Sequence, residues 1–192
     1  VPPAAIHTLK KDGFSIRHKT SFEEKYVADV GMMLLANGEI LEREKLERAV
    51  KLKTLGYLGN SKTKLSQGLC TDMGIVLFDD PKMGVRSPEL IAKRMADFIN
   101  KGHTFRSTNF PNLQLPRIPD AHRLIHIHKN MPGIMAQINK VFADHHINIV
   151  GQYLMTNPSI GYVITDVSQE YDKKVFRALK QIDHTIKFRI LY

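Results

Sequence analysis

The order of apolar patterns in the last third of the chain is the feature that most limits the fold. Four segments have the residue alternation or β-branched content of strands: 123–129, 147–156, 160–167 and 185–191. Apolar residues at helical spacing lie between the first two of these segments and between the last two, at 134–142 and 175–182. The resulting order, βαββαβ, predicts a ferredoxin-like domain with both helices on one face of an antiparallel sheet.

The first hundred residues predict a different architecture. Short apolar runs that predict strands occur at 30–35, 55–58 and 75–78, with a further strand-like segment at 14–17. Helical patterns alternate with these runs, at 3–11, 42–51, 65–72 and 87–101. Ser87 is a suitable N-cap for the last of these helices, and Gly102 a suitable stop. This alternation predicts a small α/β layer with a parallel, flavodoxin-like sheet.

A proline-containing segment separates the two patterns. Residues 105–120 hold three prolines and almost no helical pattern, which predicts an extended linker because proline restricts its own backbone and the residue before it. We therefore expect an α/β domain at 1–104, the linker at 105–120 and the ferredoxin-like domain at 121–192.

Composition excludes several classes of protein. No apolar run approaches the roughly 20 residues of a membrane helix, and the N-terminal residues do not resemble a signal peptide. A single cysteine, Cys70, forms no internal disulfide, so a cytoplasmic protein is predicted. The net charge of +9 is compatible with nucleic acid, but basic residues are interleaved with acidic ones, as in 42–48. We expect neither nucleic acid nor a membrane as a partner.

Polar side chains after the first strand of the C-terminal domain form the clearest candidate site. His128 and Asn130 precede the start of a helix, where Pro132 suits the first turn. That helix start offers unpaired backbone N–H groups and the positive end of a dipole, which favour a carboxylate. Asn148 accepts from an ammonium, and His128 or Asn130 bonds a hydroxyl. The set favours a zwitterionic amino acid, and it contains no nucleophile or paired carboxylate.

Two alternatives compete with an amino-acid site. His126 and His128 are also compatible with polar residues on the exposed face of a strand. A metal site would need three or four convergent ligands, but the adjacent His145 and His146 point in different directions on a helix and no cysteine joins them. We therefore expect no metal and no catalytic residue.

Several short strings in the C-terminal domain are similar to those of a known protein family. They lie at 123–128, 130, 132–133, 139–140, 142–143, 148–149, 152–154, 161–163 and 191–192. With the linker phrases at 109–111 and 115–116, these strings resemble the ACT domain of the D-3-phosphoglycerate dehydrogenase family. The resemblance implies that L-serine binds between two ACT domains, with contacts from His128, Asn130 and Asn148. The start of the helix completes the expected site with Met131, Pro132, Gly133 and Ile134.

The resemblance also implies how the domain would act. Serine is expected to favour pairing of two ACT domains and so to exert allosteric regulation in serine biosynthesis. The expected oligomer is a homodimer formed through the ACT domains, or a mixed assembly with a full-length dehydrogenase. Glycine or alanine remains open as the ligand, because the residue pattern does not fix the hydroxyl preference.

Residues 1–104 resemble the substrate-binding domain of the same family, through 10–14, 52–56 and 73–78. The family inserts a dinucleotide-binding domain between such pieces, yet no G-x-G-x-x-G occurs in this sequence. The segment 36–38 stands where the resemblance places a substrate arginine and serine. We therefore expect a pseudoenzyme with no cofactor. The alternative is a truncated or vestigial NAD-dependent phosphoglycerate dehydrogenase.

Overall fold

A computed structural model describes residues 1–17, 24–35, 43–58, 67–79, 87–168, 171–172 and 174–191. The chain divides into two compact units, Val1–Asn109 and Phe110–Tyr192. The division falls inside the segment 105–120. None of the helices in the described residues is long and apolar enough to cross a membrane.

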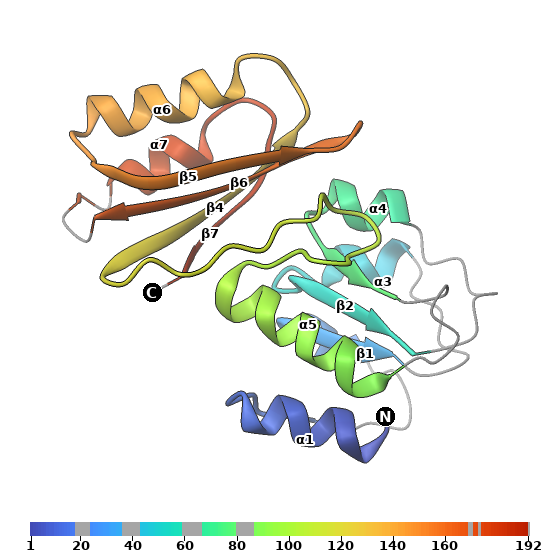
Figure 1. The fold of residues 1–192 in the computed structure, drawn as a ribbon. Helices are drawn as coiled ribbons and strands as arrows, with labels where there is room; N and C mark the ends of the chain where they lie inside the picture. Colours follow the sequence, from blue (N-terminus) through green and yellow to red (C-terminus); the bar gives the residue numbers. More distant parts are fainter. Residues whose placement is uncertain are drawn as a thin grey trace. The chain divides into compact units, whose positions relative to one another are not determined.

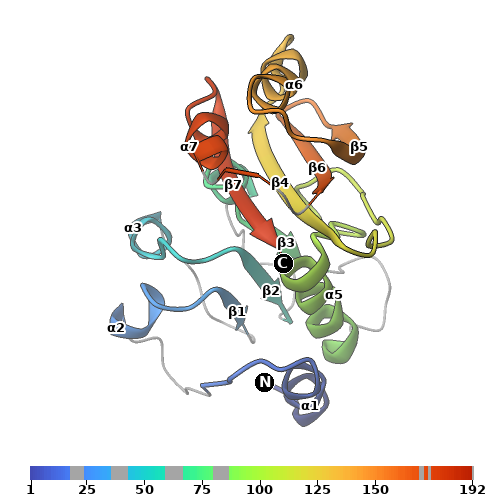
Figure 2. The ribbon, with the colours of Figure 1, turned by 90° about the vertical axis from the view of Figure 1, so that its left-hand side faces the viewer.

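The first unit contains a three-stranded parallel sheet in the order β1-β2-β3. Its strands are β1 (Met32–Leu35), β2 (Thr54–Tyr57) and β3 (Val76–Phe78). Its helices are α1 (Pro3–Lys11), α2 (Glu24–Val27), α3 (Arg43–Arg48), α4 (Gln67–Asp72) and α5 (Pro88–Lys101). Helix α5 packs on β2, and α1 lies beside α5 in both views (Figures 1 and 2). The predicted small parallel α/β layer is confirmed.

The caps of α5 agree with the sequence, whereas one predicted strand does not. Ser87 Oγ accepts a hydrogen bond from the Leu90 amide, and Gly102 ends the helix in the left-handed conformation, with φ of 76°. The strand-like segment at 14–17 lies in no strand. Phe14 and Ile16 pack instead against an apolar cluster that includes Leu9 of α1. Their alternation therefore reflects packing against helices rather than pairing in a sheet.

The second unit is an antiparallel sheet in the order β5-β6-β4-β7. Its elements are β4 (Ala121–Lys129), α6 (Ile134–Asp144), β5 (Ile149–Thr156), β6 (Ile160–Ser168), α7 (Lys174–Lys180) and β7 (Thr185–Leu191). Both helices cover one face of the sheet (Figure 1). Buried residues of the helices, such as Phe142 and Leu179, pack with Leu124 and Val163 of the sheet. The predicted ferredoxin-like βαββαβ fold is confirmed.

Helix α6 begins two residues later than expected. Gly133 is the N-cap and has φ of 84°, a left-handed conformation, so the helix cannot extend backwards through this residue. Pro132 consequently lies in the turn before the helix and not in its first turn, so this detail of the prediction is wrong.

The predicted linker is ordered against each unit in turn. In the first unit, Asn109 Oδ1 accepts from the Leu77 amide at 2.8 Å, and its Nδ2 donates to the Ile75 carbonyl at 2.8 Å. In the second unit, residues 110–120, here called the strap, lie on the sheet face opposite the helices (Figure 1). Phe110 is buried there, edge-on to Tyr162 with ring centroids 5.8 Å apart. The strap gives the sheet a covered second face.

Candidate ligand-binding site

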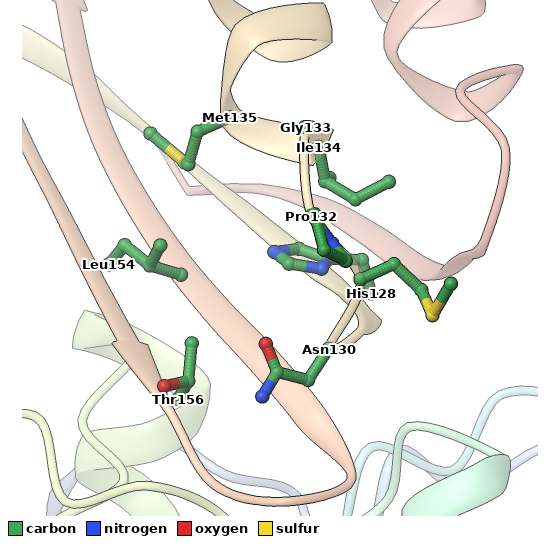
Figure 3. A pocket seen from close by; sticks show the side chains of 9 residues that line it. His128, Asn130, Pro132, Gly133, Ile134, Met135, Leu154 and Thr156 are labelled. Carbon is green, nitrogen blue, oxygen red and sulfur yellow. The ribbon is translucent and has the colours of Figure 1, made fainter.

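A pocket of about 440 Å³ lies where the end of β4, the start of α6 and the end of β5 meet (Figure 3). The residues that line it are His128, Asn130, Met131, Pro132, Gly133, Ile134, Met135, Leu154 and Thr156. All of the ligand residues expected from the sequence are among them except Asn148. The structure therefore brings together the expected residues that are close in sequence.

His128 lines the pocket, and its ring carries one acceptor without a partner among the described residues. Its Nδ1 lies 2.7 Å from the Lys129 carbonyl oxygen, and because a carbonyl only accepts, this nitrogen carries the proton. Burial lowers the pKa of His128, partly offset by that carbonyl, so the ring is neutral near pH 7. The Nε2 lone pair is buried, and within the described part of the chain it has no hydrogen-bond partner. A donor group of a ligand would satisfy it.

Asn130 offers a second acceptor. Its Nδ2 donates to the Asn157 carbonyl at 2.9 Å, while its backbone amide donates to the Ser159 carbonyl at 3.0 Å. These bonds fasten the loop after β4 to the turn between β5 and β6. Figure 3 shows the Asn130 amide between His128 and Thr156. With the amide nitrogen engaged, Oδ1 is the atom that remains to accept from a ligand.

The start of α6 supplies donors. No side chain caps this helix, whose N-cap is Gly133. The first N–H groups of a helix have no partner within it, and the dipole makes that end attractive to a carboxylate. Ile134, Met135 and Leu154 add apolar side chains to the lining of the pocket. A lining that combines acceptors with these donors matches the ammonium and carboxylate of an amino acid.

His126 lies behind His128 and does not line the pocket. It is buried, its Nε2 lies 2.7 Å from Thr185 Oγ1, and its ring is edge-on to His128 with centroids 5.9 Å apart. Burial, with a smaller contribution from His128, lowers the pKa of His126 to about 4. Neither histidine is an exposed polar residue on a strand face. Within the described residues, no group of three potential metal ligands comes together.

Asn148 lies away from this pocket in the same chain. It is exposed just before β5, and its carbonyl accepts from the Ser168 amide at 3.1 Å. Thr156 ends the same strand, so the two residues are separated by roughly 25 Å at the usual rise per residue. A single copy therefore does not join Asn148 to His128 and Asn130.

Sequence reasoning missed Met135, Leu154 and Thr156. Thr156 is opposite Gly161 in the β5–β6 pairing, and β6 in turn pairs with β4, which places the end of β5 near His128. The sheet order, which periodicity does not reveal, was needed to find these residues. The segment 36–38, where the resemblance places substrate residues, lies outside the described residues.

Comparisons with known proteins identify the second unit. The model of the "AHAS small subunit-like ACT domain" family matches residues 124–187. The D-3-phosphoglycerate dehydrogenase of Haemophilus influenzae is 41% identical over 102 residues, which are 53% of this chain and 25% of that protein. The enzyme of Escherichia coli K12 is 38% identical over 104 residues, with the same two shares.

A solved structure of an ACT domain, from the GTP pyrophosphokinase of Chlorobium tepidum, is 14% identical with a TM-score of 0.32. The match covers 37% of this chain and 96% of that one. The chain spans about a quarter of the length of the curated relatives it matches. The sequence matches confirm the predicted resemblance: the second unit contains an ACT domain, which relates this chain to the D-3-phosphoglycerate dehydrogenases.

Proposed function

We propose that this chain is an amino-acid-binding regulatory protein whose ACT domain binds L-serine. The observation that carries the proposal is the polarity of the pocket. His128 Nε2 and Asn130 Oδ1 are acceptors for an ammonium or hydroxyl, and the uncapped start of α6 faces a carboxylate. The volume of about 440 Å³ has room for a small amino acid.

The edge of the sheet supports a site built by two copies. Strand β5 pairs with β6 on one side, and no strand of the described residues pairs with its other side. Val150 and Tyr153 are 46% and 54% exposed on this strand, an apolar edge of the kind that pairs with another chain. Two-fold antiparallel pairing of β5 with its copy sets the start of one strand beside the end of the other. Asn148 of a second copy then lies near Leu154 and Thr156.

Regulation follows from this geometry because ligand binding and the pairing of two chains are thermodynamically linked. A ligand held by residues of two copies binds the paired state more tightly than the unpaired state, so it shifts the population toward pairing. The partner in this proposal is a second copy of the chain or the ACT domain of a full-length D-3-phosphoglycerate dehydrogenase. In either assembly this chain acts as a sensor without catalysing a reaction.

Calorimetric titration of the full chain with L-serine tests the proposal. We expect saturable heat, greatly reduced in Asn130→Ala and in Asn148→Ala, and a serine-dependent rise in dimer by sedimentation. Asn139→Ala is the matched control, because Asn139 is an exposed asparagine of α6 outside the pocket. Titrations with glycine and L-alanine measure how much the serine hydroxyl contributes to the binding affinity. A folded protein that gives no heat with any of them contradicts the proposal.

The dehydrogenase relatives favour a second candidate, an NAD-dependent oxidoreductase. This candidate requires binding of a nicotinamide cofactor by the chain itself. Fluorescence titration of NADH with the full chain separates the two functions: saturable binding supports the oxidoreductase, and its absence beside a positive serine titration supports the sensor.

A further inference from the structure

Gly161 and His128 face each other across the β4–β6 pair, where they are register partners. A Cβ atom placed on Gly161 would overlap His128 Cε1 and Nε2 and would lie 3.0 Å from Nδ1. The imidazole therefore rests directly on the backbone of β6. No neighbouring side chain is closer to that position than this ring.

The reason for a glycine at this position is space and not backbone conformation. Gly161 does not have the positive φ that marks Gly133 and Gly102. Gly161 is the second residue of β6, and within a strand glycine loses more conformational entropy on folding than other residues and contributes no packing. Glycine weakens the strand, but at position 161 it leaves the space that the His128 ring occupies.

Two further contacts hold the ring in this position. Nδ1 is fixed to the Lys129 carbonyl at 2.7 Å, and the His126 ring stands edge-on to it at 5.9 Å with an interplanar angle of 86°. His126 is itself held by Thr185 through a 2.7 Å hydrogen bond. A side chain at position 161 would therefore push the imidazole off the Lys129 carbonyl and toward the pocket.

We propose that Gly161 is a positioning residue of the amino-acid pocket: its lack of a side chain seats His128 with Nδ1 on the Lys129 carbonyl and Nε2 as the acceptor. The consequence for ligand binding rests on the proposed function. The position of the His128 ring against Gly161, here called the seat, is a property of the unliganded protein. It is therefore testable without any ligand.

The test is a double-mutant cycle in the full chain, with Gly161→Ala, His128→Ala and both together. Gly161→Ala should lower the folding equilibrium constant about tenfold or more when His128 is present, because the new methyl group overlaps the ring. With His128→Ala it should be neutral or stabilising, since alanine restricts the unfolded chain. Gly68→Ala in α4 is the control, because no atom of the described residues outside its own helix backbone lies within 4 Å of its added Cβ.

Nitrogen-15 spectra of the histidines provide a readout that loss of stability alone does not move. We expect the Nδ1-protonated tautomer at His128 in the parent protein and in Gly68→Ala, and its loss in Gly161→Ala. An equal cost of Gly161→Ala in both backgrounds, with an unchanged His128 spectrum, overturns the proposal. If Gly161→Ala alone fails to fold, a double variant that folds supports the seat, and one that also fails overturns it.

Serine titration then separates the two proposals. If the parent binds serine, Gly161→Ala should weaken binding about tenfold or more, while Gly68→Ala leaves it unchanged. Unchanged affinity in a Gly161→Ala protein with an altered His128 spectrum overturns the positioning role. If the parent does not bind serine, the proposed function fails, and the cycle and the spectra still decide the seat.

Discussion

Arg123 fastens three parts of the ACT unit together, and its removal should be among the most costly single changes. The side chain is 1% exposed. Nε and Nη2 donate to the two carboxylate oxygens of Asp166 at 2.8 and 2.7 Å. Nη1 and Nη2 also donate to the carbonyls of Leu115 and Pro116 in the strap, at 3.2 and 2.7 Å. One guanidinium thus joins β4 to β6 and both to the strap.

The cost of Arg123→Leu follows from these contacts. Asp166 would keep a buried carboxylate without its cation, and loss of one partner of a buried ion pair costs about 3–5 kcal/mol. The strap carbonyls would also lose donors, at roughly 1 kcal/mol each. We expect a total of about 5–7 kcal/mol, a large part of the 5–15 kcal/mol that stabilises an ordinary domain.

The double variant Arg123→Leu with Asp166→Leu separates these contributions. An apolar pair that replaces a buried ion pair is often neutral or stabilising, so most of the first cost should return. The strap should remain loosened, because Leu115 and Pro116 still lack their donor. We therefore expect near-normal protection of β4 and β6 together with faster cleavage of the strap.

Hydrogen exchange of the β4 and β6 amides measures the first effect, and limited proteolysis at residues 110–120 measures the second. Lys140→Leu is the control, because Lys140 forms an exposed pair with Asp144 that should contribute about 0.5 kcal/mol or less. If Arg123→Leu costs no more than Lys140→Leu, or if the double variant is as unstable as the single one, the reasoning is refuted.

Three further outcomes follow from local chemistry. The pKa of His126 is lowered from 6.5 to about 4 in the folded protein, so the unfolded chain takes up the proton first as the pH falls. The free energy of unfolding should therefore fall by roughly 3 kcal/mol from pH 6.5 to 4. Urea unfolding at several pH values measures this slope, which should be much smaller in His126→Phe. Ser87→Ala should cost about 1 kcal/mol by urea unfolding, since the Leu90 amide loses its cap, and no change would contradict this. Burial raises the pKa of Cys70 to about 11, so an alkylating reagent should modify it in urea far faster than in the native protein, and equal rates would disprove its burial.

Much of the fold was predictable because each element carries its own signal. The cap at Ser87 and the stop at Gly102 bound α5 as expected, and the change from helical spacing to alternation identified the βαββαβ unit. The strap was not predictable from the same signals. Its prolines indicate extended chain, but the burial of Phe110 depends on Tyr162, and the bonds of Arg123 depend on a sheet formed later in the sequence.

Only part of the candidate site was predictable from the sequence, for the same reason. His128, Asn130 and the start of α6 were predictable because they are neighbours in sequence and the turn at Gly133 folds them together. Leu154 and Thr156 join them only through the order of β5, β6 and β4. Local chemistry therefore identified one wall of the pocket, and sheet topology was needed for the other.

Asn148 distinguishes the pocket of one chain from the site that the proposed pairing would form. Its amide suits an ammonium, yet β5 separates it from the pocket by the full length of the strand. Within one chain, unfolding most of β5 would be required to bring the two together, and β5 is hydrogen-bonded to β6 along its length. The proposed two-fold pairing of the exposed edge would bring Asn148 of one copy near the pocket of the other without breaking any of those bonds, because antiparallel strands place the start of one beside the end of the other. The placement that excludes Asn148 from its own pocket is therefore the placement that a shared site requires.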